Sequence, residues 1–326
     1  RARRIGLYAS LTRRWPAEVE AAIAARYDLE VNQEDRPLDA AALRDALGRA
    51  DALCPTVTDR IDAAVVGTRP VRARVLGNFG VGFNHIDLDA ARHAGLSVTN
   101  TPGVLTECTA DIALTLLLMV ARRAGEGERE LRAGAWTGWR PTHLLGTQVS
   151  GKTLGLIGFG RIAQAVARRA HAGFGMRVLF HTRSAPPPEV VAALGATQAA
   201  SLDELLAQSD FVSLHCPGGA ATHHLLNAER LARMRPDAFL INTARGDVVD
   251  QDALIAALAA GRLAGAGLDV YAGEPRVPAP LLAMQNVVLL PHLGSASRET
   301  RVAMGLRVLA NLDAFFAGRE PPDRVA

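Results

Sequence analysis

Along the chain, short continuous runs of apolar residues alternate with segments in which apolar residues recur every three or four positions. The short runs are typical of buried strands, and the periodic segments predict amphipathic helices. In the first hundred residues we expect strands at 4–9, 28–31, 52–54 and 75–79, with helices at 16–25, 38–47 and around 61–66. Because strands alternate with helices, this region predicts a parallel sheet with right-handed crossovers.

The same alternation returns after a long helical segment expected at 106–131 and a loop at 134–146 that is rich in glycine and tryptophan. Strands are expected at 153–157, 177–181, 211–215, 238–242, 264–270 and 287–290. Helices are expected from 161 onward, near 189–194, and at 202–208, 227–234, 251–260 and 298–317. The predicted fold class is therefore α/β, with two Rossmann-like, doubly wound parallel sheets. The apolar run 112–121 is too short to cross a bilayer and predicts a buried helix.

A strand, a glycine turn and a helix follow one another in residues 151–169, GKTLGLIGFGRIAQAVARR. Gly158, Gly160 and Ala163 form a G-x-G-x-x-A pattern in that context, which is a dinucleotide-binding fingerprint. Glycine lets the backbone approach a pyrophosphate, and the N-terminus of the next helix offers it free N–H groups. The alternative is an ordinary glycine-rich turn, and the motif alone names no reaction.

The position of this fingerprint in the middle of 326 residues predicts two domains. Residues 102–291 contain the fingerprint strand and those that follow it, so we expect them to form a dinucleotide-binding domain. Residues 1–101 form their own α/β unit, and the last helix, within 292–326, has no sheet of its own. We therefore expect 1–101 and 292–326 to form a substrate domain, with the active cleft between the two domains.

The charge balance and the cysteines narrow the classes of partner. The net charge is +3, carried by dispersed arginines with Lys152 as the only lysine, so neither nucleic acid nor a membrane surface is favoured as a partner. Cys54, Cys108 and Cys216 are far apart and match no disulfide or metal-site spacing. The start of the chain lacks the apolar core of a signal peptide. These features predict a cytoplasmic protein without a metal site.

The residues after the second strand of the dinucleotide domain bear on the choice of cofactor. In NAD-binding folds an acidic residue at that point holds the ribose hydroxyls, whereas here the strand 177–181 is followed by Thr182, Arg183 and Ser184. A carboxylate would repel a 2′-phosphate, whereas a guanidinium and hydroxyls bind it. We therefore predict that NADP(H) is preferred. The alternative is that Arg183 stacks on adenine and that NAD(H) is used as well.

Three residues with useful chemistry each follow an expected strand of this domain: Arg245, Glu274 and His292. Taken singly, they could be a surface arginine, a loop glutamate and a capping histidine. Together they would meet at the carboxyl edge of the sheet, where ligands of such folds bind. A permanently charged guanidinium can orient a carboxylate, and a histidine beside an acid can transfer a proton.

In these motifs the chain resembles the D-isomer-specific 2-hydroxyacid dehydrogenase family over nearly its whole length. The resemblance is carried by residues 158–162, 241–252, 273–275 and 291–296. It implies that Arg245 binds the substrate carboxylate and keto oxygen, that His292 is the acid/base and that Glu274 pairs with His292. It also implies that the N–H groups of Val81 and Gly82 bind the carboxylate. Besides Arg245, His292 and the residues of the fingerprint, it places the following at the dinucleotide: Thr109, Arg161, Ile162, Cys216, Pro217, Thr222, Thr243, Ala244, Asp269 and Gly294.

Within that family, residues 78–87, 102–106 and the loop 136–146 resemble the glyoxylate/hydroxypyruvate reductase (D-glycerate dehydrogenase) branch. The resemblance implies reduction of glyoxylate to glycolate and of hydroxypyruvate to D-glycerate by hydride transfer, with His292 as the proton donor. It also implies a homodimer, in which that loop reaches towards the partner. The alternatives are a dehydrogenase for D-lactate or larger 2-keto acids, and a corepressor-like protein that senses a dinucleotide.

Overall fold

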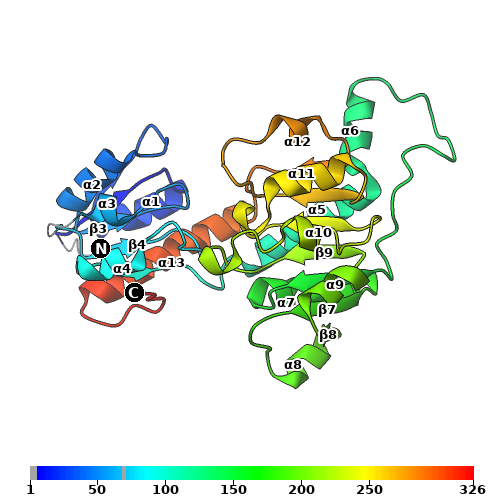
Figure 1. The fold of residues 1–326 in the computed structure, drawn as a ribbon. Helices are drawn as coiled ribbons and strands as arrows, with labels where there is room; N and C mark the ends of the chain where they lie inside the picture. The colour runs from blue at the N-terminus through cyan, green and yellow to red at the C-terminus, as the bar shows by residue number, and fades with distance from the viewer. Residues whose placement is uncertain (1–5, 68–70) are drawn as a thin grey trace. The chain divides into compact units, whose positions relative to one another are not determined.

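The computed structural model describes residues 6–67 and 71–326, and the chain divides into two compact units (Figure 1). The first unit comprises Arg1–Leu105 and Ala296–Ala326, and the second comprises Thr106–Ser295. Both changes of unit lie a few residues later in the chain than the boundaries at 101/102 and 291/292 expected from the sequence. Each unit is built on a parallel sheet covered by helices, so the α/β fold class is confirmed.

The first unit contains a five-stranded parallel sheet in the order β2-β1-β3-β4-β5. Its strands are β1 (Tyr8–Leu11), β2 (Asp28–Val31), β3 (Ala52–Cys54), β4 (Val75–Gly77) and β5 (Ser97–Thr99). Its helices are α1 (Ala17–Ala24), α2 (Ala40–Arg49), α3 (Ala63–Val66), α4 (Leu88–His93) and α13 (Arg298–Phe316). The first two residues of the strand expected at 4–9 lie outside the described residues.

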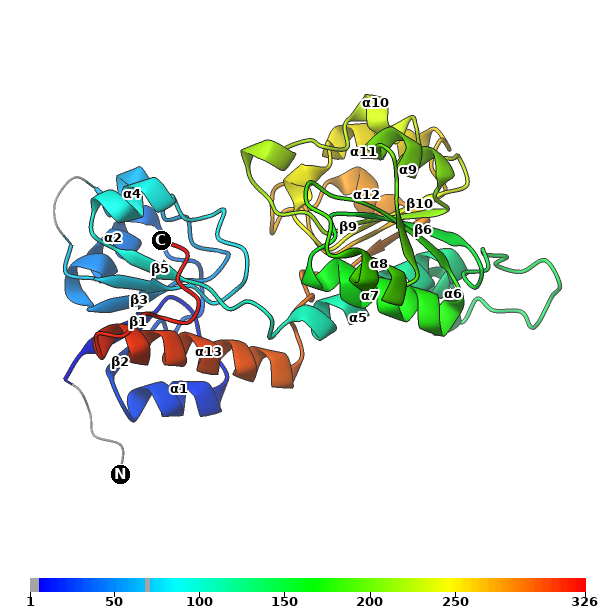
Figure 2. The same cartoon turned by 90° about the horizontal axis from the view of Figure 1, so that it is seen from below.

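Two hydrophobic cores lie on opposite faces of this sheet (Figure 2). Helices α2, α3 and α4 cover one face, and α1 and α13 cover the other. Within β3, Leu53 packs into the first core, whereas its neighbours Ala52 and Cys54 pack into the second. This alternation follows from the pleat of a strand. It also explains why α13, which lies more than 200 residues after α1 in the sequence, belongs to the first unit.

The second unit contains a seven-stranded parallel sheet in the order β12-β11-β10-β9-β6-β7-β8. Its strands are β6 (Thr153–Ile157), β7 (Arg177–His181), β8 (Ala196–Gln198), β9 (Phe211–Leu214), β10 (Phe239–Asn242), β11 (Gly265–Leu268) and β12 (Val287–Leu289). The chain runs outward from β6 in one direction and then from β9 in the other. The carboxyl ends of β6 and β9 therefore mark the switch point, where this type of sheet binds ligands.

Helices cover both faces of this second sheet. On one face lie α5 (Thr106–Arg122) and α7 (Arg161–Phe174), with α6 (Ala124–Arg132) following α5 and α8 (Pro188–Ala193) following β7. On the other lie α9 (Leu202–Gln208), α10 (Ala228–Leu231), α11 (Gln251–Ala259) and α12 (Ala279–Ala283). Single 3-10 turns follow β9 and β10, at Ala220–Thr222 and Gly246–Val248.

The prediction of one long helix over 106–131 is wrong, because the helix breaks at Arg123. This residue has a left-handed backbone (φ 56°), and α6 starts immediately after it. The amide of Thr147 donates to the carbonyl of Ala121 at 2.8 Å, so a later segment takes the acceptor that a continuing helix would use. Strands β5 and β8 and helix α4 were not expected from the sequence. Among the helices within residues 6–67 and 71–326, none is long and apolar enough to cross a membrane.

Candidate active site

The glycine turn after β6 has the two properties that a dinucleotide requires. Gly158 has φ 88°, and a Cβ added to it would lie 2.7 Å from the His215 carbonyl oxygen. Gly160 precedes the first turn of α7 without a side-chain cap, and a Cβ added there would meet nothing within 4 Å. Ala163 is fully buried between helix and sheet. The first glycine is therefore required by the fold, and the second leaves space in front of free helix N–H groups that fits a pyrophosphate.

The residues predicted to bind a 2′-phosphate lie at the carboxyl end of β7. Arg183 and Ser184 are exposed, and the Thr182 hydroxyl donates to the Ser184 carbonyl at 3.5 Å. Within the described residues no hydrogen-bond or ion-pair partner is recorded for the Arg183 guanidinium. The first residue of α7, Arg161, is exposed as well, and Ile162 is half-buried. The strand thus ends in a free cation and hydroxyls at the point where an NAD-binding fold carries an acid.

The loop after β9 runs beside the glycine turn. The amide nitrogen of Cys216 would lie 3.0 Å from a Cβ on Gly158, so the two segments are in close contact. The Thr222 hydroxyl donates to the Pro217 carbonyl at 2.5 Å and closes this loop. Burial raises the pKa of the Cys216 thiol to about 11, so the thiol is uncharged at neutral pH. These contacts place Cys216, Pro217 and Thr222 at the edge of the switch point between β6 and β9.

Arg245 follows β10 in a loop that Asn242 holds from both sides. The Asn242 side chain accepts from the Ala244 amide at 3.0 Å and donates to the Arg245 carbonyl at 3.0 Å. Burial lowers the pKa of Arg245, and the charges of Glu274 and Asp247 act against that shift. The group remains a cation at neutral pH. In the same loop, the buried Thr243 hydroxyl has no hydrogen-bond partner among the described residues.

The loop of Arg245 lies directly against the loop that follows β11. A Cβ on Gly246 would overlap the backbone of Tyr271 and Ala272, so only glycine permits this approach. The Tyr271 amide donates to Glu274 Oε1 at 3.1 Å, which fixes the glutamate on the second loop. Gly246 thereby brings the guanidinium-bearing loop and the carboxylate-bearing loop together at one edge of the sheet.

Glu274 and His292 are hydrogen-bonded to each other, in the pairing that the family resemblance implies. Glu274 Oε2 lies 2.8 Å from His292 Nδ1, and the two side chains are 33% and 32% exposed. Burial would raise the pKa of Glu274, but the hydrogen bonds from His292 and the Tyr271 amide and the charges of His292 and Arg245 outweigh it and lower the pKa. The glutamate is therefore a carboxylate at neutral pH. Because Nδ1 is engaged by Glu274, Nε2 is the nitrogen of His292 that can serve a ligand.

The turn that carries His292 is held by Asp269, the residue after β11. His292 has a left-handed backbone (φ 56°), which is unfavourable for a residue with a Cβ. The Asp269 carboxylate accepts from the amides of Leu293 at 2.6 Å and Gly294 at 2.9 Å, and its carbonyl accepts from the His292 amide at 3.0 Å. The Thr109 hydroxyl donates to the Gly294 carbonyl at 3.1 Å.

Asp269 thus has a role that sequence reasoning missed. The resemblance places Asp269 at the dinucleotide, and that placement stays a prediction. In the structure both of its carboxylate oxygens accept backbone amides of the turn after His292. Burial raises the pKa of Asp269 even though these amides and His292 lower it. A short acid directly after a buried strand is the only signal in the sequence, and it does not reveal which amides the acid will bind.

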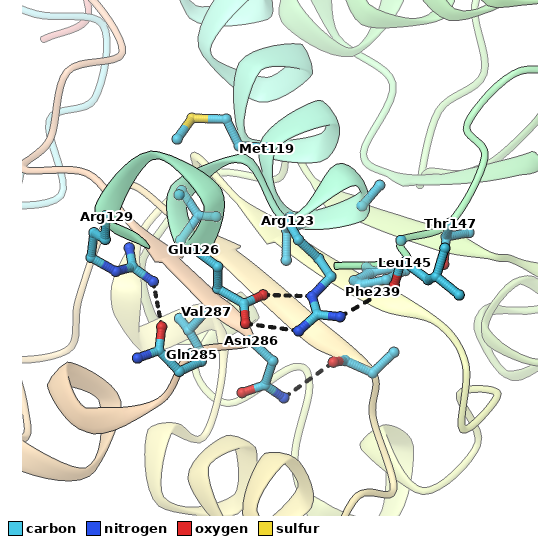
Figure 3. Close-up of a pocket in the computed structure, with 16 residues that line it drawn as sticks. Met119, Arg123, Glu126, Arg129, Leu145, Thr147, Phe239, Gln285, Asn286 and Val287 are labelled. Atoms are coloured by element: carbon cyan, nitrogen blue, oxygen red, sulfur yellow. Dashed lines mark hydrogen bonds and ion pairs between the residues drawn. The ribbon is translucent and has the colours of Figure 1, made fainter. Parts of the chain in front are cut away.

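The structure brings Arg245, Glu274 and His292 together because they follow β10, β11 and β12, which are neighbours in one parallel sheet. Val81 and Gly82 belong to the first unit, where they follow β4. The second unit also has a cavity of about 400 Å³ at the opposite, amino edge of the sheet (Figure 3). Arg123 is paired with Glu126 there, and Arg129 donates to Gln285 (Figure 3). This cavity contains none of the candidate catalytic residues.

Comparisons with known proteins agree with this geometry. Residues 114–294 match the family model described as "D-isomer specific 2-hydroxyacid dehydrogenase, NAD binding domain". The chain is 45% identical to a glyoxylate reductase of Thermococcus kodakarensis over 97% of this chain and 95% of that protein. It is 42% identical to a glyoxylate reductase of Thermococcus litoralis, over 97% of this chain and 95% of the relative.

Solved structures show the same likeness. A protein of Thermus thermophilus is 48% identical with a TM-score of 0.90, over 98% of this chain and all of that one. An NADPH-dependent glyoxylate/hydroxypyruvate reductase of Sinorhizobium meliloti, solved with NADP and malonate, is 36% identical with a TM-score of 0.87, over 98% of this chain and 97% of that one. The chain therefore belongs to the D-isomer-specific 2-hydroxyacid dehydrogenase family of NAD(P)-dependent oxidoreductases.

Proposed function

We propose that this protein reduces small 2-keto acids, glyoxylate to glycolate and hydroxypyruvate to D-glycerate, with NADPH as the preferred reductant. The observation that carries the proposal is the group of Arg245, Glu274 and His292 at the carboxyl ends of adjacent strands, in the same sheet as the glycine turn. The glyoxylate reductases among its relatives support the choice of substrate.

Different residues of the chain would bind the dinucleotide and donate the proton. When bound, the reduced nicotinamide supplies the hydride for the keto carbon. Gly158, Gly160 and the N-terminus of α7 would hold the pyrophosphate, and the unpartnered Thr243 hydroxyl would take a polar group of the dinucleotide. Charge that develops on the keto oxygen requires a proton, which His292 donates from Nε2 while Glu274 holds Nδ1.

Arg245 and the backbone amides of Val81 and Gly82 bind the carboxylate of the keto acid. A guanidinium binds a carboxylate through two parallel hydrogen bonds, which fixes the orientation of the substrate as well as its position. Glyoxylate and hydroxypyruvate both present that carboxylate beside the carbonyl to be reduced. Orienting the carbonyl in this way lowers the barrier without any further chemical group.

The test is a panel of glyoxylate, hydroxypyruvate, pyruvate and phenylpyruvate, assayed with NADPH and with NADH. We expect the highest kcat/KM for the first two. His292→Gln should lower kcat by orders of magnitude, and Arg245→Lys should raise KM for the keto acid while the protein stays folded. Near-normal turnover by His292→Gln would refute the assignment. Better turnover of pyruvate or phenylpyruvate would identify a sister dehydrogenase, and dinucleotide binding without turnover of any keto acid would favour a corepressor-like protein.

The preference for NADPH rests on Thr182, Arg183 and Ser184. A free guanidinium and two hydroxyls at the end of β7 suit a 2′-phosphate, and no acid follows the strand directly. Arg183→Gln should lower kcat/KM for NADPH by at least tenfold and leave that for NADH nearly unchanged. A wild-type preference for NADH would refute this part of the proposal and leave the reaction itself in place.

A homodimer is proposed from the loop between α6 and β6, which extends away from the seven-stranded sheet in both views (Figures 1 and 2). Three large apolar side chains are exposed on this one loop, Trp136 (49%), Trp139 (83%) and Leu145 (65%), and a concentration of such side chains indicates an interaction site. His143 Nε2 lies 2.6 Å from Glu130 Oε2 and ties the loop to α6. Light scattering should give the mass of a dimer for the wild type and of a monomer for Trp136→Ser/Trp139→Ser. A monomeric wild type would contradict the proposal.

A further inference from the structure

We propose that Asn78 and Asn100 are positioning residues, which hold the backbone amides of Val81 and Gly82 ready for the substrate carboxylate. The inference rests on the proposed function, which assigns those amides to the carboxylate. It goes further by naming the side chains that build this amide site, and these do not touch the substrate themselves.

Asn78 is a fully buried residue directly after β4, and its amide group bridges the following loop. Its Nδ2 donates to the Gly80 carbonyl at 3.1 Å and to the Gly82 carbonyl at 3.0 Å. Both hydrogens of the side-chain amide are therefore used. The loop is folded back over the side chain of its own first residue.

Asn100 holds the same loop from the neighbouring strand. It follows β5, and its Nδ2 donates to the Val81 carbonyl at 3.0 Å. The next amide along the chain, that of Thr101, donates to the Gly80 carbonyl at 3.0 Å. The three successive carbonyls of Gly80, Val81 and Gly82 are thus all occupied by donors of the protein.

Occupation of these carbonyls fixes the direction of the amides. In a planar trans peptide the N–H of one residue points opposite to the carbonyl of the residue before it. The N–H groups of Val81, Gly82 and Phe83 therefore point away from the groups that bind the loop carbonyls. For these amides no acceptor is recorded among the described residues, and the three residues are half-buried. Successive free amides of this kind form an anion-binding concavity.

The Gly80 and Gly82 carbonyls fix which way round the Asn78 amide lies, because only its nitrogen can donate to them. Asn78 Oδ1 then faces His85 Nε2 at 2.8 Å, where a protonated Nε2 can donate to it. The reverse orientation would set the side-chain oxygen against the oxygens of Gly80 and Gly82. The loop needs such support, because glycines at 80 and 82 leave the backbone free to rotate and Gly80 has φ 150°. Without the asparagines, a peptide flip would turn the amides away from the anion.

The experiment uses Asn78→Asp and Asn100→Asp, which keep the shape of each side chain and remove its N–H donors. Asn32→Asp is the matched control, because Asn32 Nδ2 also donates to two carbonyls in the first unit, those of Thr12 at 3.0 Å and Arg36 at 2.7 Å. For each variant we would measure kcat and KM for glyoxylate, the Kd of oxalate, the Kd of NADPH and the Tm. Oxalate serves as an unreactive dicarboxylate probe of the amide site.

We expect Asn78→Asp and Asn100→Asp to raise the KM of glyoxylate and the Kd of oxalate at least tenfold. Their kcat should change less than threefold and their Kd for NADPH should stay the same, a split that general loss of structure would not produce. Asn32→Asp should leave all four constants unchanged. Unchanged oxalate and glyoxylate constants in folded Asn78→Asp and Asn100→Asp would overturn the proposal.

Two further measurements cover the cases in which Asn78→Asp does not fold or the wild type is inactive. If Asn78→Asp does not fold, Asn100→Asp and Asn100→Ala, which remove a single hydrogen bond, decide the question. If the wild type reduces no keto acid, the proposed function fails, but calorimetry of oxalate binding to the wild type and to the same variants still tests the amide site. Equal oxalate affinity in wild type and variants would then reject the role of the asparagines on its own.

Discussion

Asp269→Asn should disturb the position of His292, and so lower kcat, while leaving the binding of the dinucleotide unchanged. The Asp269 carboxylate accepts the amides of Leu293 and Gly294, and the turn they close holds His292 at a φ of 56°. Asparagine has the same shape but only one acceptor oxygen. One of the two amides, of which that of Gly294 is buried, would then face an NH₂ group and lose its partner.

The magnitude follows from that lost bond. A buried donor left without an acceptor costs about 1–3 kcal/mol, so the Tm of the second unit should fall by several degrees. A non-glycine residue in an unfavourable backbone region costs about 1–3 kcal/mol, which the clamp offsets. If the weakened clamp lets His292 relax, the productive population falls about 10- to 100-fold, since 1.4 kcal/mol corresponds to a factor of ten. We expect kcat to fall by that factor.

The assay compares kcat for glyoxylate with the Kd of NADPH measured by nucleotide fluorescence. Asp250→Asn is the control, because Asp250 also accepts a backbone amide in the second unit, that of Ala253 at 3.2 Å. Asp269→Asn should lower kcat and leave the Kd of NADPH unchanged, whereas Asp250→Asn should change neither. A weaker NADPH complex with normal kcat would refute the clamp and make Asp269 a dinucleotide contact.

Three further perturbations test the same architecture. Gly160→Ala should leave the Tm unchanged and weaken NADPH binding at least tenfold, because a Cβ there meets only the open space in front of α7; retained affinity would show that the cradle lies elsewhere. Gly246→Ala should lower both the Tm and kcat, because its Cβ overlaps the Tyr271 backbone, whereas Gly173→Ala in α7, where nothing lies within 4 Å, should be neutral or stabilising. Burial lowers the pKa of His215 to about 4, so between about pH 6.5 and pH 4 the unfolded chain binds a proton that the folded chain refuses. As the pH falls from about 6.5 to about 4, the free energy of unfolding of the wild type should therefore decrease by up to about 3 kcal/mol. Urea titrations check this, and a His215→Gln variant that loses as much stability over the same pH range as the wild type would contradict it.

The elements that the sequence predicts best are those whose apolar residues follow a clear continuous or helical pattern. Strands β6 and β7 and helix α9 have the expected bounds, because their apolar residues are continuous or strictly periodic. Strand β8 was missed because two of its three residues are exposed, so it carries no apolar run. The break at Arg123 was missed for a different reason. It depends on the return of Thr147 to the end of α5, and a local pattern holds no information about that contact.

The candidate site divides in the same way. Arg245, Glu274 and His292 could be predicted because each carries a reactive side chain in the loop that follows a strand, and parallel strands bring such loops to one edge. Asp269 and Asn78 could be seen as polar residues after a strand, but not as supports. Their partners are backbone amides and carbonyls whose directions are set only when the loops are folded.

The side chains that hold these loops share one feature: each is a short Asn or Asp at the end of a parallel strand. Parallel strands end where their ladder of hydrogen bonds stops, so the first loop residues have carbonyls and amides without partners, which are costly to bury. A short Asn or Asp at that point can supply the missing donors or acceptors within a few residues. Asn242, Asp269, Asn78 and Asn100 all do so, each directly at or after the end of a strand, and each next to a segment assigned to substrate or proton transfer. Because these side chains hold the loop backbones, the loops can use glycine and a left-handed histidine where the chemistry requires them. A buried Asn or Asp at the carboxyl end of a parallel strand is therefore evidence that the loop after it must hold one conformation, and in this chain it points to the loops on which catalysis depends.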